Sequence, residues 1–274
     1  MVDIESIPIV ELSVGEAAAG LVLSTEARWN QTEADWRFFL SQGTVYGMRD
    51  KGQLIATAAL LPYSSGNAWI SMVLVTASWR RRGIATRLVD SCLAKAMKLG
   101  LTTWLDATPV GANVYGPLGF TPTLQLRRLR LENPNQAKAT TPLSTCSLDA
   151  FIAGDRSTMG FERHLLLAEF AGRCETRLLS HGDAMAIVRD GRTARHIGPL
   201  FAETSQRALA LVDAIVHSEP GPWLLDAVNS KAEFLTGLVN SGWTIERPFQ
   251  RMRFGRATTR AEQLPFAVAG PEFG

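Results

Sequence analysis

The sequence has few cysteines, and they are poorly placed for either disulfides or metal binding. Three occur in 274 residues, at Cys92, Cys146 and Cys174, and none belongs to a Cys-x-x-Cys pair. An odd and widely spaced set predicts small buried thiols in a reducing compartment. The four histidines all lie in the second half of the sequence and show no metal-ligand spacing, so we expect no metal site.

The sequence also lacks a strong net charge and a long apolar segment. Its formal net charge is +2 and its pI is about 8.5, too mild to predict a nucleic-acid or membrane surface. We find no signal peptide and no run long enough to cross a bilayer, so we expect a cytoplasmic protein, either a monomer or a homodimer. The hydrophobic content of 46% predicts a globular chain with enough core for two modest domains.

An arginine-rich turn at 80–82 stands between a predicted strand and a predicted helix. Residues 70–75 are apolar and β-branched, and from Ile84 onward apolar residues recur at a spacing of four until Gly100. The first turn of a helix carries partial positive charge, so arginines there are unfavourable unless an anion is bound. With Gly83 allowing close approach, the turn predicts a phosphate or pyrophosphate cradle. A solvated basic turn is the alternative.

The two halves of the sequence resemble each other. Trp104-Leu105-Asp106-Ala107 is echoed by Leu224-Leu225-Asp226-Ala227, and Gly119-Phe120 by Gly242-Trp243. A weak internal duplication of one α/β unit is the economical explanation. A polar, proline-bearing stretch between the copies predicts domains at 1–133 and 145–274, joined by a linker at 134–144.

The second copy has lost the arginine turn. The stretch that leads into its helix, 196–203, contains no arginine, and Pro199 removes one N–H donor. We therefore expect an anion cradle in the first copy alone.

The strand, the Arg80-x-x-Gly83-x-Ala85 turn and the following helix resemble the GNAT superfamily of acyl-CoA-dependent N-acetyltransferases. That family's signature is Q/R-x-x-G-x-G/A directly after its fourth strand. The stretch 108–120, with Tyr115 and Gly119-Phe120, is similar to the family's helix after strand five. The resemblance covers residues 5–131, and residues 145–255 resemble a degenerate second unit. It implies an α/β (α+β) GNAT fold, with a mixed, mostly antiparallel sheet flanked by helices and duplicated in a second, smaller unit.

The resemblance implies that acetyl-CoA binds along the first unit. The backbones of Val73 and Val75 would bind the pantetheine arm like an added strand, and the N–H groups at 81–86 would hold the pyrophosphate. A strand splayed open beside Val73 and Leu74 would aim an N–H group at the thioester oxygen. The implied cofactor-binding residues are Val73, Leu74, Val75, Arg80, Arg81, Arg82, Gly83, Ile84, Ala85, Thr86 and Thr108.

Tyr115 is the implied general acid, protonating the departing thiolate; an aromatic anchor of the short helix is the alternative. No general base is identified, because Asp106 beside the site serves equally well as a cap of the following turn. Trp29, Asn30 and Tyr63 fall where GNAT folds build the acceptor pocket, with plain packing as the alternative for the two aromatic residues. The apolar tail is expected to dock near the first unit's site.

These observations predict an acetyl-CoA-dependent N-acetyltransferase that is catalytic in its first unit and acts on a primary amine of a small molecule or a protein. One alternative is a non-catalytic acyl-CoA-binding sensor or regulatory protein. A nucleic-acid binder using residues 80–82 is a poor alternative, because one basic cluster lacks the wider basic face that such proteins need.

Overall fold

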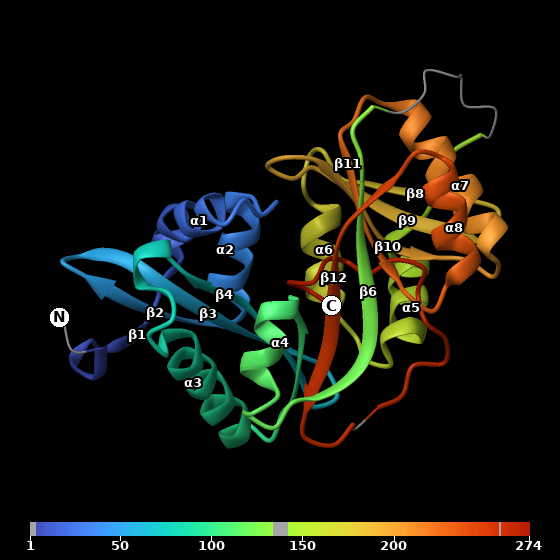
Figure 1. Ribbon diagram of the computed structural model, residues 1–274. Helices are drawn as coiled ribbons and strands as arrows, with labels where there is room; N and C mark the ends of the chain where they lie inside the picture. Colours follow the sequence, from blue (N-terminus) through green and yellow to red (C-terminus); the bar gives the residue numbers. More distant parts are fainter. Residues whose placement is uncertain (1–3, 134–141, 258) are drawn as a thin grey trace.

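The computed structural model describes residues 4–133, 142–257 and 259–274 (Figure 1). One twelve-stranded sheet runs through both halves of the chain, in the order β1-β2-β3-β4-β5-β12-β6-β11-β10-β9-β8-β7. Its strands are β1 (Ile9–Glu11), β2 (Thr44–Asp50), β3 (Gln53–Tyr63), β4 (Asn67–Val75), β5 (Thr102–Ala107), β6 (Thr121–Leu131), β7 (Ser144–Thr145), β8 (Arg177–His181), β9 (Ala184–Arg189), β10 (Arg195–Phe201), β11 (Trp223–Val228) and β12 (Thr244–Phe254). The described α-helices are α1 (Ala17–Glu26), α2 (Glu33–Gln42), α3 (Ile84–Lys98), α4 (Pro109–Tyr115), α5 (Leu148–Met159), α6 (His164–Ala171), α7 (Ser205–Ser218) and α8 (Ala232–Asn240). The β4–β5 and β10–β11 pairs are parallel and the other pairs antiparallel, which confirms the predicted mixed sheet.

The helices cover both faces of the sheet in the first half of the chain (Figure 1). On one face, α3 packs against β2, β3 and β4 through a buried stripe that includes Leu88 and Cys92, as the spacing of four predicted. On the other face, the core beneath α1 and α2 continues into α5 and α6 of the second half. One hydrophobic cluster therefore extends across both halves. None of the helices within the described ranges is long and apolar enough to span a bilayer.

The two units exchange their last strands. β12, from the second half, lies between β5 and β6, while β6, from the first half, lies between β12 and β11 (Figure 1). The proposed division at 1–133 and 145–274 follows the sequence repeat, but each half completes its sheet with a strand of the other. Of the predicted linker, residues 134–141 lie outside the described residues, and its last residue, Ser144, begins the short strand β7 (Ser144–Thr145), which pairs with β8.

Two buried ion pairs accompany the exchange. Asp106 on β5 lies opposite Arg251 on β12, and Asp226 on β11 lies opposite Arg128 on β6. Each arginine donates through Nε and Nη2 to both carboxylate oxygens of its partner, at 2.8 Å for every bond. Asp106 and Asp226 occupy corresponding positions of the sequence repeat, so each unit's carboxylate is neutralised by an arginine on the strand received from the other unit.

His196 on β10 is a second partner of Asp226. Arg189 Nη2 donates to His196 Nδ1 at 3.5 Å, which leaves Nε2 to donate to Asp226 Oδ2 at 3.0 Å. Burial lowers the pKa of His196 to about 4, and the charges of Arg189 and Arg128 act in the same direction against the effect of Asp226. His196 is therefore a neutral hydrogen-bond donor at neutral pH.

Replacing one member of a buried ion pair should cost much of the fold's stability. Arg128→Met leaves Asp226 buried without its counter-charge, so we expect a loss of about 3–5 kcal/mol in the free energy of unfolding. Urea denaturation measures it. The matched control is Arg37→Met, which removes an exposed helical pair with Glu33 and should change stability by about 0.5 kcal/mol or less. Equal effects of the two variants would contradict the buried role of Arg128.

The lowered pKa of His196 makes stability depend on pH. The unfolded chain binds a proton near the usual pKa of 6.5, whereas the folded chain resists protonation down to about 4, so stability present above pH 6.5 is lost as the pH falls through this window. His196→Gln removes this contribution, so the stability difference between wild type and variant should shrink by about 2–3 kcal/mol between pH 7.5 and 4.5. Urea denaturation at both pH values measures it, with the exposed His164→Gln as control. Parallel pH curves for wild type and His196→Gln would contradict the assignment.

Candidate active site

The parallel strands β4 and β5 diverge in the middle of the sheet. Their pairing runs from Asn67 opposite Thr102 to Trp69 opposite Trp104. Just beyond this point β4 bulges, because its register against β3 shifts between Thr57 and Ala59. The predicted splay of the strand beside Val73 and Leu74 is thus present, and it leaves an opening toward β5.

Met72 holds the bulge in a strained conformation. Its φ of 50° lies in the left-handed region, which a bulky side chain rarely adopts. The Thr57 hydroxyl on β3 donates to the Met72 carbonyl at 2.8 Å within the core. Such strain persists where the surrounding structure fixes it, and it is concentrated at functional sites. Here it sets the direction of the β4 backbone from Val73 onward.

The arginine turn leads directly into the N-terminus of α3. Arg81 and Gly83 both have left-handed backbones, with φ of 60° and 80°. Gly83 is the N-cap of α3 and supplies no capping side chain, and the first turn contains no acidic residue. A Cβ on Gly83 would meet no described heavy atom within 4 Å, so the approach to the first N–H groups of the helix is open. These features fit an anion site.

The arginine side chains of the turn are exposed, and two of them donate hydrogen bonds to backbone carbonyl groups. Arg80 Nε donates to the Val75 carbonyl at 3.0 Å, and Arg82 Nη2 donates to the Ser78 carbonyl at 2.9 Å. The Arg82 guanidinium also lies 4.8 Å from the centre of the Trp79 ring. Each guanidinium keeps other N–H groups for a ligand.

A cavity opens at the bulge, beside the diverging strands. Its lining consists of Trp29, Gln31, Ile70, Ser71, Met72, Val73, Leu105, Asp106, Thr108, Tyr115, Arg128, Arg247, Phe249, Pro271 and Glu272. It therefore brings together the β4 bulge, the end of β5, α4, both exchanged strands and the C-terminal segment.

Tyr115 enters this cavity from the last turn of α4. The helix begins at Thr108, whose hydroxyl accepts a hydrogen bond from the Gly111 N–H at 3.2 Å. Tyr115 is largely buried and packs against Phe120. Burial raises the pKa of the Tyr115 hydroxyl, which keeps it protonated at neutral pH. The Thr108 side chain caps α4 and also lines the cavity.

Asp106 lines the cavity as well, but its carboxylate is engaged. Both of its oxygens accept hydrogen bonds from Arg251. Asp106 therefore forms a bidentate ion pair with Arg251, in place of the turn cap that the sequence left open as an alternative. Because both oxygens accept hydrogen bonds from the guanidinium, the carboxylate has little capacity left to accept a substrate proton.

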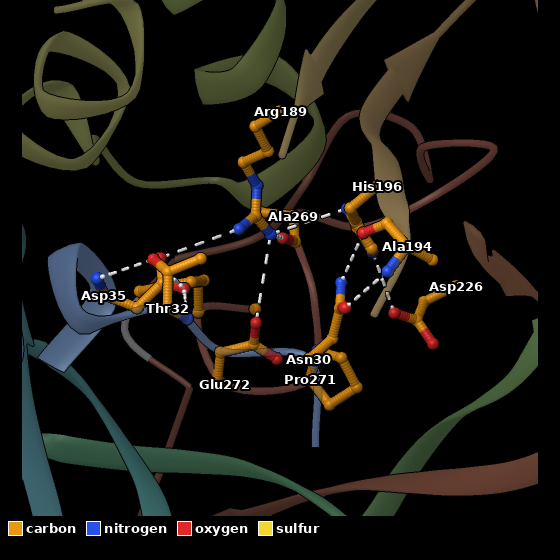
Figure 2. A network of polar contacts seen from close by, with 12 residues as sticks. Asn30, Thr32, Asp35, Arg189, Ala194, His196, Asp226, Ala269, Pro271 and Glu272 are labelled. Carbon is orange, nitrogen blue, oxygen red and sulfur yellow. Dashed lines mark hydrogen bonds and ion pairs between the residues drawn. The ribbon is translucent and has the colours of Figure 1, made fainter. Parts of the chain in front are cut away.

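Of the three residues expected in the acceptor pocket, one lines the cavity and the other two hold neighbouring elements in place. Trp29 lines the cavity. Asn30 holds the loop between β9 and β10, where its Oδ1 accepts from the Ala194 N–H and its Nδ2 donates to the Ala194 carbonyl, both at 3.0 Å (Figure 2). Tyr63 lies outside the cavity, stacked on Phe161. Asn30 thus fastens the second unit beside the cavity.

The C-terminal segment, residues 266–274, closes the far side of the cavity. Trp69 Nε1 donates to the Pro271 carbonyl at 3.0 Å, and the Tyr63 hydroxyl donates to the Phe273 carbonyl at 2.9 Å. The Phe273 ring stacks on Phe39 with centroids 4.9 Å apart. The predicted docking of the tail near the first unit's site is confirmed.

Glu272 lies between these anchored residues and was not predicted as a site residue. Its side chain is largely buried, and its nearest cationic group is Arg189 Nη2 at 3.9 Å (Figure 2). Burial raises the pKa of Glu272, against the lowering effect of Arg189 and Arg128. The sequence signal was weak: one acidic residue in an apolar tail.

The second unit has the same strand divergence, and the C-terminal segment fills it. β10 and β11 pair in parallel from Arg195 to Ile197, after which β10 shifts its register against β9. Residues 266–268 lie in the resulting gap. A Cβ on Gly198 would come within 2.1 Å of the Val268 carbonyl oxygen, so this close approach requires glycine.

Backbone hydrogen bonds hold the segment on both sides of the gap. The Leu200 N–H on β10 donates to the Ala267 carbonyl, and the Val228 N–H at the end of β11 donates to the Phe266 carbonyl, both at 3.0 Å. The place where an extended ligand would bind the second unit is therefore taken by the protein's own chain.

Family models match both halves of the chain. Residues 17–120 match the acetyltransferase (GNAT) family, and residues 152–267 match an acetyltransferase (GNAT) domain. No curated protein sequence matches the chain.

Solved structures share the fold of the whole chain. A putative acetyltransferase from Pyrococcus horikoshii superposes with a TM-score of 0.84 at 16% identity, covering 100% of this chain and 98% of that one. A tandem GNAT protein from the clavulanic acid biosynthesis pathway has a TM-score of 0.65 at 14% identity, covering 92% and 100%. A GCN5-related N-acetyltransferase from Sphaerobacter thermophilus has a TM-score of 0.63 at 13% identity, covering 93% and 98%.

Each half of the chain matches a GNAT family model, and the tandem fold is shared with solved structures over nearly the whole length. The splayed strand and the arginine turn agree with these matches. The chain therefore belongs to the GNAT acetyltransferases and contains two GNAT units in tandem.

Proposed function

We propose that this protein is an acetyl-CoA-dependent N-acetyltransferase whose first unit transfers the acetyl group to a primary amine of a small molecule or a protein. The amine attacks directly, within a ternary complex. The observation that supports this most strongly is the continuity of the site: the splayed edge of β4 meets the arginine turn at one end and the cavity containing Tyr115 at the other.

The open edge of β4 and the uncapped start of α3 fit the two parts of coenzyme A. The backbones of Val73, Leu74 and Val75 would bind the pantetheine arm as an added strand. The N–H groups at 81–86, with the arginine side chains, would hold the pyrophosphate through charge-assisted hydrogen bonds. When bound, acetyl-CoA supplies the acyl group as an activated thioester.

Two groups of the chain would act on the reacting atoms. A backbone N–H group at the bulge beside Val73 would stabilise negative charge that develops on the acyl oxygen. The Tyr115 hydroxyl, kept protonated by its buried position, would give a proton to the leaving sulfur. A buried, protonated phenol in the acceptor cavity favours an enzyme over a sensor that only binds the cofactor.

Tyr115→Phe should separate binding from turnover. Because the variant loses the proton donor and keeps the ring, we expect kcat to fall by about 100-fold or more, while the affinity for acetyl-CoA changes little. Thiol release with an amine panel measures the rate, and calorimetric titration measures the affinity. Tyr46→Phe, on β2 and away from the cavity lining, is the matched control. An unchanged rate would remove Tyr115 from the mechanism.

A further inference from the structure

The acceptor cavity contains polar atoms without partners. Gln31 Oε1, Ser71 Oγ and Arg247 Nε are buried, and none has a hydrogen-bond partner within the described parts of the chain. All three residues line the same cavity. Buried polar atoms are almost always hydrogen-bonded, so such a group of orphans in one cavity indicates a site for a polar ligand.

Arg247 and Glu272 are the charged groups of the described cavity lining that lack a hydrogen-bonded counter-ion. Arg247 forms no ion pair with a described carboxylate, and burial together with the nearby charge of Arg128 lowers its pKa. Glu272 forms an ion pair with Arg189 at 3.9 Å, a separation longer than a hydrogen bond. Arg189 is itself engaged, donating through Nη2 to the Ala269 carbonyl (Figure 2). The cavity thus offers one anion and one cation to a ligand.

The other charged side chains of the lining are neutralised. Asp106 is paired with Arg251, and Arg128 with Asp226, each through two hydrogen bonds. The charges available to a ligand therefore come from the exchanged strand β12 and from the C-terminal segment. Both belong to the second half of the chain.

We propose that the acceptor is a small zwitterion of the α-amino acid class, whose ammonium group binds Glu272 and Gln31 Oε1 and whose carboxylate binds Arg247. This inference rests on the proposed function and names the substrate class of that site. A polyamine or a lysine side chain would leave the half-buried Arg247 cation, whose Nε is fully buried, without an anion, which is unfavourable. An amino acid satisfies both charges at once.

The same arrangement gives Glu272 a part in the reaction. The substrate ammonium gives one proton to Glu272, and its nitrogen then bonds to the acyl carbon as the bond from that carbon to sulfur breaks. Tyr115 protonates the sulfur, and the second proton lost by nitrogen restores the phenol. The proton on Glu272 passes to solvent, so the products are an amide, a free thiol and one proton. Burial raises the pKa of Glu272, which improves the carboxylate as a proton acceptor.

A binding panel tests the substrate class on the wild-type protein without a cofactor. The twenty amino acids are compared by calorimetric titration with their carboxamides and with the corresponding decarboxylated amines. We expect at least one amino acid to bind, and its amide and its amine to bind about tenfold more weakly or worse. Equal affinity for acid and amide, or binding of the simple amines alone, would overturn the proposal.

Two variants test which residue binds the carboxylate of the ligand and which binds its ammonium group. Arg247→Met should abolish the preference for the acid over the amide, and Glu272→Gln should weaken amino acid binding and reduce kcat in the thiol-release assay. Arg37→Met and the exposed Glu233→Gln are matched controls, and thermal unfolding without ligand checks that each variant is folded. A retained acid preference in folded Arg247→Met would overturn the assignment.

The experiments distinguish a wrong substrate class from a wrong acetyltransferase function. If acetyl-CoA binds and other amines are acetylated while amino acids neither bind nor react, the substrate class is wrong and the acetyltransferase function stands. If acetyl-CoA itself does not bind, the proposed function fails.

Discussion

Residues 266–268 fill the gap between β10 and β11 with a short length of backbone, and the rest of the active site depends on this contact. The hydrogen bonds to Leu200 and Val228 fix the segment in the second unit. Five residues after Val268, the Phe273 ring is packed in the first unit's core against Phe39. Because the segment is held at both ends, the residues between them, Pro271 and Glu272, are placed in the lining of the cavity beside β4 and β5. The segment thus fills the gap of the second unit and forms part of the cavity wall in the first.

The exchange of β6 and β12 also makes the two units depend on each other. Each strand leaves its own half, pairs in the other, and takes with it an arginine that neutralises a buried aspartate there. A separate first unit would lack both the partner of Asp106 and the Arg247 side chain. The second unit has kept its fold, and its residues form part of the wall of the cavity beside β4 and β5.

Much of the cofactor side could be predicted from the sequence, because its parts are local. The strand, the arginine turn and the helix follow one another within 30 residues, and Tyr115 follows within the next 20. The strand exchange could not be predicted, because β6 and β12 are copies of one another: Arg128 and Arg251 match either aspartate equally well by sequence. The acceptor side could not be predicted either, because Gln31, Arg247 and Glu272 are distant in sequence and meet through the exchange and the returning tail. Asn30 and Tyr63 were expected in the pocket, and they instead hold the elements that form it.

We propose that the first unit alone binds the cofactor, because in the second unit the gap between β10 and β11 is filled by residues 266–268. Calorimetric titration with acetyl-CoA tests it most directly, with Arg82→Glu just before α3 compared with Arg207→Glu in the first turn of α7 in the second unit. We expect one equivalent of acetyl-CoA to bind per chain. The Arg82→Glu variant should bind it more weakly, and the Arg207→Glu variant should bind it with unchanged affinity. Two equivalents per chain, or weakening by Arg207→Glu alone, would contradict it.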